Sequence, residues 1–140
     1  MITADTKLII KELTAVLEAS DDIDKVSTGP LEPIVTEESS AAVYIAVESV
    51  TLENSRLTTG ANGYDRHMLI NLYCNVDTSE DPLGIYDFMD GLERTILDDS
   101  ELWTVLVDRD VVGLNFDAQQ FEPKRTVTML IDISYRLTCN

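Results

Sequence analysis

The chain has few of the residues from which metal-binding and redox sites are built. Among its 140 residues are two cysteines, Cys74 and Cys139, which show no CxxC or Cys/His spacing. The only histidine, His67, cannot complete a transition-metal site by itself, because such a site needs several ligands. We therefore predict reduced cysteines and no metal site, and we interpret His67 as a strand side chain at the surface of a sheet.

Sequence signatures of catalysis are also missing. The chain contains no GxGxxG, no GxxxxGK[ST] and no GxSxG. The segment TTGANG (58–63) lacks a following lysine and precedes a predicted strand, so it is not a phosphate loop. The acidic doublets Glu37-Glu38 and Asp98-Asp99 belong to no calcium-loop pattern. We predict a protein that is not an enzyme and has no cofactor, and a small enzyme using a divalent metal is the least favoured alternative.

Basic residues are scarce as well. There are 10 Lys and Arg against 26 Asp and Glu, and the formal net charge is −16. A protein of this charge repels DNA phosphates and anionic lipid. No apolar run approaches the roughly 20 residues that span a bilayer, and acids interrupt the apolar residues of MITADTKLIIKELTAVLEAS. The sequence predicts a protein of the cytoplasm that binds neither DNA nor membranes.

The apolar residues that are present suffice for one core. Hydrophobic residues make up 44% of the chain, and its length is typical of one domain, so we treat 1–140 as a single domain. Apolar residues mostly three and four apart predict an N-terminal helix capped by Thr3 or Asp5. The following connector, which contains Gly29, Pro30 and Pro33, can include one edge strand.

The middle of the chain alternates strands and a helix. AAVYIAVESVTLE and DRHMLINLYCNV have the alternation of two strands, joined as an antiparallel hairpin by a long loop at about 54–63. The period then changes in PLGIYDFMDGLERTILDD, where apolar residues at i, i+4, i+7 and i+11 predict a helix with Ser79 or Asp81 as N-cap and Pro82 in its first turn. LWTVLVDRDVVGLNFDAQQ predicts a strand with a bend or bulge near 108–110.

The last segment, KRTVTMLIDISYRLTCN, predicts a strand with two different faces. One side carries Val127, Met129, Ile131, Ile133, Tyr135 and Leu137, and the other carries Thr126, Thr128, Leu130, Asp132, Ser134 and Arg136. The order of elements predicts an α+β fold. We expect a mainly antiparallel sheet of four to five strands, with two helices packed on the apolar face of the closing strand.

This succession of elements resembles the tail terminator (tail completion) proteins of long-tailed bacteriophages, including the lambda minor tail protein U type. The resemblance covers nearly the whole chain and is carried by an N-terminal helix, a hairpin loop and the segments VYIAVESVTLE, DRHMLINLYCNV, PLGIYDFMDGLERTILDD and KRTVTMLIDISYRL. It implies a subunit that forms a ring, typically a hexamer, on the last layer of the tail tube. Such a ring ends tube polymerisation and offers a surface to the head connector.

The resemblance also implies partners and a location. The partners are further copies of the chain, the tail tube protein and the head-tail connector, and DNA passes through the lumen of the ring without specific binding. The protein belongs to the head-proximal end of the virion tail after assembly in the host cytoplasm. Alternatives are a head completion or connector protein, a tail tube protein and a monomeric adaptor.

The candidate residues for a subunit interface or a lumen are polar positions of the sheet's second face, residues of the hairpin and scarce cations. They are Arg56, Leu57, Arg66, Asn71, Asn75, Asp132, Ser134 and Arg136. The second face can pack against a neighbouring subunit, line a lumen or face water, and the sequence leaves these alternatives open. The loop at 54–63 is long enough to serve as an assembly arm.

Overall fold

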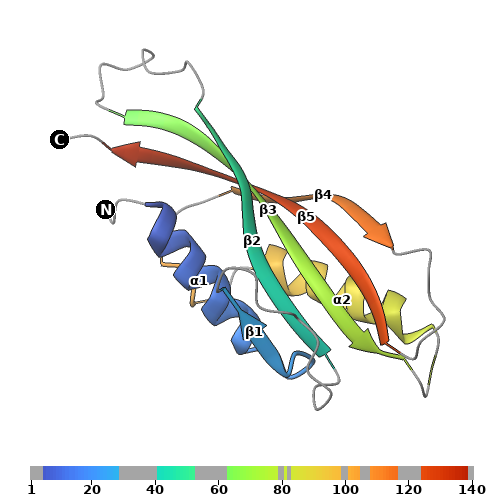
Figure 1. The fold of residues 1–140 in the computed structure, drawn as a ribbon. Coiled ribbons are helices and arrows are strands. Elements are labelled where there is room, and N and C mark those ends of the chain that lie inside the picture. The colour runs from blue at the N-terminus through green and yellow to red at the C-terminus, as the bar shows by residue number, and fades with distance from the viewer. Residues whose placement is uncertain are drawn as a thin grey trace.

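The computed structural model describes residues 5–28, 41–52, 63–78, 81, 83–98, 101–104, 108–116 and 124–138, with the backbone alone at 52, 63–65, 124–125 and 136–138. These residues form two helices and five strands (Figure 1). The elements in chain order are α1 (Thr6–Glu18), β1 (Lys25–Ser27), β2 (Ala41–Leu52), β3 (Gly63–Asp77), α2 (Gly84–Leu97), β4 (Asp108–Phe116) and β5 (Lys124–Thr138).

The strands form one twisted sheet in the order β1-β2-β3-β5-β4, and both helices lie on the same side of it (Figure 1). All neighbouring strands are antiparallel except β1, which pairs in parallel with β2. The predicted α+β class and the helix-covered sheet are thus confirmed. The edge strand expected in the connector is β1, which is held where Asp24 and Ala41 exchange hydrogen bonds.

The helices begin in different ways. Asp5 is the N-cap of α1, as predicted, and its Oδ1 accepts from the Leu8 amide at 2.7 Å. The predicted start of α2 was wrong: Leu83 is the N-cap and makes no side-chain cap bond, while Asp81 bonds the Leu83 amide ahead of the helix. Ser79 and Pro82 lie outside the described residues. No helix in the described ranges is both long and apolar enough to cross a bilayer.

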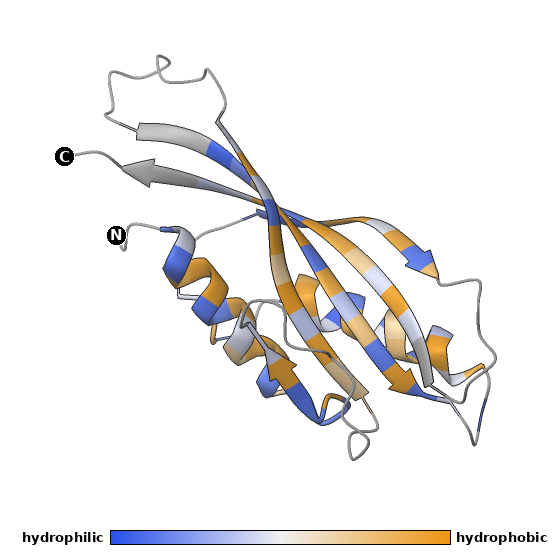
Figure 2. Ribbon diagram, viewed as in Figure 1, coloured by the Kyte–Doolittle hydropathy of each residue, from blue (hydrophilic) through white to orange (hydrophobic). Residues whose placement is uncertain are grey.

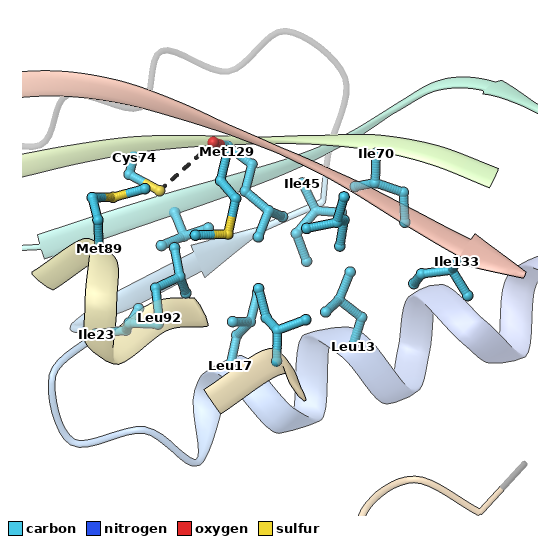
Figure 3. Packing of buried hydrophobic residues seen from close by; sticks show 14 of the residues in the cluster. Leu13, Leu17, Ile23, Ile45, Ile70, Cys74, Met89, Leu92, Met129 and Ile133 are labelled. Atoms are coloured by element: carbon cyan, nitrogen blue, oxygen red, sulfur yellow. Dashed lines mark hydrogen bonds between the residues drawn. The ribbon is translucent and has the colours of Figure 1, made fainter. Parts of the chain in front are cut away.

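The core lies between the helices and the covered side of the sheet, which we call the helix face. Apolar stripes of both helices point toward this face (Figure 2), and their buried residues interleave with those of β2, β3 and β5 (Figure 3). The buried set includes Ile9, Leu13, Leu17, Ile85, Met89, Leu92, Ile96, Ile45, Ile70, Leu72, Cys74, Met129, Ile131 and Ile133. Burial of such side chains is the main stabilising contribution to the fold.

The two faces of β5 follow the predicted alternation. Val127, Met129, Ile131, Ile133 and Tyr135 are all buried on the helix face, whereas the side chain of Leu137 lies outside the described part. Within the same core, Cys74 donates from its thiol to the Leu72 carbonyl at 3.6 Å (Figure 3). Burial raises the pKa of the Cys74 thiol to about 12, because the thiolate would be desolvated.

Two strands contain irregularities at positions that the sequence pattern did not predict. In β4 the register shifts between Val111 and Gly113, while Asp108–Asp110 pair regularly with β5, so the bulge predicted at 108–110 was wrong in position. In β2 a shift between Val47 and Ser49 leaves Val47 opposite Ile70 yet 44% exposed. A bulge arises where two residues of one strand lie opposite one residue of its neighbour, and it changes the local twist and the direction of the side chains. The alternation within a single segment does not show how that segment pairs with its neighbour.

Two polar links attach the helix layer to the sheet, and a third joins it to the segment before β4. The hydroxyls of Thr6 and Tyr135 lie 2.9 Å apart and join the start of α1 to β5. Arg109 of β4 donates to the carbonyls of Ile96 and Asp98 at the end of α2, and its guanidinium lies 4.6 Å from the ring centre of Trp103.

The third link joins α1 to the 101–104 segment. The buried carboxylate of Glu12 accepts from both the amide and the hydroxyl of Thr104. Its other oxygen is buried and has no hydrogen-bond partner in the described ranges. These links fix where the two helices lie. Neither α1 nor α2 covers the opposite side of the sheet (Figure 1).

Candidate functional site

The side of the sheet away from the helices, which we call the open face, is the candidate functional surface. Strand alternation places on it every second residue of β2, β3 and β5. Cross-strand pairs identify these residues: Tyr44 lies opposite Tyr73, Asn71 opposite Leu130, and His67 opposite Ser134. Most of them are partly exposed, whereas most of their neighbours on the helix face are buried.

The centre of the open face is an uncharged strip, although 26% of the chain is charged. The strip consists of Ala42, Tyr44, Ala46, Leu69, Asn71, Tyr73, Asn75, Thr126, Thr128 and Leu130. The rings of Tyr44 and Tyr73 lie 6.1 Å apart at its middle. Tyrosine, asparagine and threonine can face water or a partner, but they cannot form ion pairs with phosphates.

One end of the uncharged strip is buried on β2 and β3. Ala42 and Asn75 lie opposite each other there, and both are buried. The Oδ1 atom of Asn75 has no hydrogen-bond partner in the described part of the chain. Thr126 of β5, opposite Asn75, is exposed, and the rest of the accessible strip runs from the tyrosine pair toward His67 and Asp132.

His67, Asp132 and Ser134 meet at the other end of the strip. The Oδ1 atom of Asp132 lies 3.3 Å from Nδ1 of His67, and the Ser134 hydroxyl lies 2.9 Å from that same nitrogen. A nucleophilic relay needs the serine on one ring nitrogen and the carboxylate on the other. The cluster is therefore not such a relay, and it shows His67, 32% exposed, as the surface strand residue that we predicted.

Acidic residues from β4 adjoin this cluster. Asp110 lies opposite Asp132 and Asp108 opposite Ser134 in the β4–β5 ladder, so carboxylates gather on the open face where β4 begins. Within the described ranges, no group of three or more His, Cys, Asp or Glu side chains is arranged to hold a metal ion. Like charges opposite each other are unfavourable, and here they make this end of the face repel anions.

The structure separates the predicted candidate residues. Asn71, Asn75, Asp132 and Ser134 lie on the open face, as expected. Arg66 does not, because it lies opposite Tyr135 on the helix face, where its Nε is buried and has no hydrogen-bond partner among the described residues. Arg56, Leu57 and the loop at 54–63 up to residue 62 lie outside the described residues, as does the side chain of Arg136.

The sheet also has two edges without a strand neighbour in the described part. On one side, β4 is the last strand. On the other side, β1 pairs with β2 only as far as Tyr44, so residues 45–52 have no outer strand partner there. Val112, Leu114 and Phe116 on the first edge and Val47 and Val50 on the second are exposed large apolar side chains.

The outer side of α2 holds a shallow depression of about 500 Å³. It is lined by Asp90, Glu93, Arg94, Leu97 and Asp98, all from α2 or the residue after it. An open surface on one helix does not enclose a ligand in the way that a binding pocket does. The candidate functional surfaces are therefore the open face and the two edges of the sheet.

The uncharged strip was not recognised from the sequence, although the signal was present as uncharged residues at alternate positions of three strands. No family model matches the chain, and no curated protein matches it.

Proposed function

We propose that the chain is a structural subunit of a bacteriophage tail. In this proposal, copies form a ring on the head-proximal end of the tail tube, end tube polymerisation and provide the surface that joins the head. The resemblance in element order suggests this function. The observation that carries it is the open face: a whole sheet surface without helical cover, uncharged at its centre and acidic at one end.

A surface of this composition suits a channel for DNA. Among the described side chains of β2, β3 and β5 on the open face there is no lysine or arginine, since Arg66 faces the helices. Lysine and arginine bind DNA by neutralising phosphates and releasing counterions. With no such cation among these described side chains, and with Asp132 and Asp110 at one end, this part of the wall repels phosphates and lets DNA slide. We expect no measurable DNA affinity at physiological salt.

The direct test is electron microscopy of the purified protein, alone and mixed with tail tubes. We expect closed rings, and tubes that bind one ring at one end and no longer elongate when tube protein is added. A tail tube protein would instead polymerise into tubes by itself, and a connector protein would bind heads but leave tube ends free. Either result contradicts the terminator function.

A second test removes the protein from the phage that encodes it. We expect filled heads and unattached tails of uncontrolled length, because growth stops only when the end of the tube offers no matching surface to the next subunit. The measurement is the distribution of tail lengths in electron micrographs. Tails of normal length attached to heads would show that the chain does not end tube growth.

A further inference from the structure

The two edges of the sheet differ in composition but match in length. The β4 edge has nine residues, Asp108–Phe116. The stretch of β2 without an outer strand partner among the described residues, 45–52, has eight. Every exposed large apolar side chain on the described strands lies on one of these two edges. Unpaired strand edges offer rows of backbone donors and acceptors, which makes them templates for pairing with another chain.

We propose that β4 of one copy pairs with residues 45–52 of β2 in the next copy, so that the sheet continues from subunit to subunit. The two strands already run in opposite directions within one sheet, because β2, β3, β5 and β4 are joined by three antiparallel pairings. In a ring, one copy is related to the next by rotation about the ring axis. If the strands run roughly along that axis, the rotation keeps their directions, so β4 of one copy and β2 of the next are antiparallel. Such a contact joins two different surfaces, which is how closed rings form.

Side-chain burial favours this pairing. It brings Val112, Leu114 and Phe116 of one copy beside Val47 and Val50 of the next, and these residues are between 39% and 54% exposed in the single subunit. Burying a large apolar side chain is favourable in proportion to the area removed from water. Tyr86 of α2, whose ring lies 5.5 Å from that of Phe116, extends the same contact on the helix side.

Charge favours β2 over a second β4 as the partner. On the open face β4 carries Asp108 and Asp110, next to Asp132 of β5. A two-fold pairing of β4 with β4 would place the same acids of a second copy on one continuous face. The β2 edge presents the uncharged Ala46, Ser49 and Thr51 on that face, and Glu48 at the bulge is the one acid of residues 45–52. A two-fold pairing would also leave residues 45–52 of both copies unpaired.

The edge pairing rests on the ring proposed above and adds the contact between its subunits. The diameter of the ring then follows from the hexamer in that proposal. In this pairing the next copy's β4 lies directly beside β2, and β1 lies beside the other end of β2, so each copy contributes four strands to the continuous wall. Six copies, at about 4.8 Å per strand, give a wall about 37 Å in diameter for upright strands and about 48 Å for strands tilted by about 40°. The helix layer lies outside, where the circumference is larger, and the open faces line the lumen. Electron microscopy of the rings measures this diameter.

Thiol crosslinking tests the contact itself. Ser49→Cys and Val112→Cys place one thiol near the middle of each edge, and both sites are exposed. The background carries Cys139→Ser, and Cys74 does not react because burial raises the pKa of its thiol to about 12. A short bis-maleimide reagent makes the result independent of the register between the strands. We expect the double variant to give a ladder of covalent oligomers and each single variant to stay monomeric on a denaturing gel.

Other outcomes overturn the pairing. Covalent dimers from Val112→Cys alone would indicate β4–β4 contact, and dimers from Ser49→Cys alone would indicate β2–β2 contact. Absence of a ladder from a folded double variant contradicts any edge contact. A ladder from a protein that fails to stop tube growth would instead leave the edge pairing standing and reject the terminator function.

A charge variant provides an independent measurement. Val112→Asp adds an acid to the β4 edge, where the side chain is 54% exposed, so the subunit should fold normally. We expect light scattering to show at least a tenfold loss of ring at concentrations where the wild type is fully assembled. The matched control is Leu97→Asp on the outer side of α2, 42% exposed, which should assemble like the wild type. Equal assembly of both variants would contradict the pairing.

Discussion

Neighbouring residues of β5 meet opposite surroundings on the two faces of the sheet. Ile131 is fully buried among helix-face side chains, whereas Asp132, one residue later, is 25% exposed and contacts His67. The backbone is equally well paired at both positions, since each has partners in β3 and β4. The faces therefore differ only in what covers them. Stability resides on the helix face, and the open face is free to serve assembly.

The largest loss of stability should come from placing a charged side chain on the helix face. Ile131→Asp would bury a carboxylate without a partner, and we expect loss of the folded state, a cost above about 4 kcal/mol. Its matched control, Asp132→Ala, removes one partner of His67 and should cost about 1 kcal/mol or less. Thermal unfolding followed by circular dichroism compares the two. Equal destabilisation would mean that the faces are wrongly assigned.

The attachment of the helix layer can be weakened separately. Arg109→Ala removes the bonds to the Ile96 and Asp98 carbonyls and the contact with Trp103, and we expect a loss of about 2–3 kcal/mol. Because Trp103 is the only tryptophan, its fluorescence should shift in the native state. Arg94→Ala on the exposed side of α2 should cost less than about 1 kcal/mol and leave the spectrum unchanged. The same spectrum and stability in both variants would show that Arg109 does not anchor α2.

Burial of Cys74 on the helix face should make the stability of the fold depend on alkaline pH. The pKa of Cys74 rises from 9.0 when exposed to about 12 in the fold. The unfolded chain therefore releases this proton first, and the folded state loses stability as pH rises from about 9 toward 12. Relative to Cys74→Ala, wild-type stability should fall by up to about 1.4 kcal/mol per pH unit in this window. Urea unfolding at pH 8 and pH 10.5 measures the difference, and parallel curves would place Cys74 outside the core.

The smallest effect is expected on the open face. Ser134→Ala removes a hydroxyl that bonds His67 at a partly exposed site, and it should change stability by less than about 0.5 kcal/mol. Urea unfolding at pH 7 provides the measurement. A loss as large as that of Arg109→Ala would mean that the His67 cluster stabilises the fold, and that the open face is not free for assembly.

Local pattern predicted much of the fold. The alternation of β5, the hairpin of β2 and β3, the apolar stripes of both helices and the Asp5 cap each depend on residues a few positions apart. Of the candidate residues, Asn71, Asn75, Asp132 and Ser134 were placed on the correct face for the same reason. The start of α2 was wrong because Asp81 bonds the Leu83 amide in a turn that precedes the helix.

The sequence by itself determined which side of each helix and strand is apolar and is buried in a core, because hydrophobic period and strand alternation are local properties of the chain. Only the tertiary structure decided that β5 lies between β3 and β4, and that the bulges fall at Val111/Gly113 and Val47/Ser49. Strand order and register depend on contacts between residues far apart in sequence. For the same reason, only the folded sheet shows two edges of matching length and an open face with no lysine or arginine among its described side chains on β2, β3 and β5.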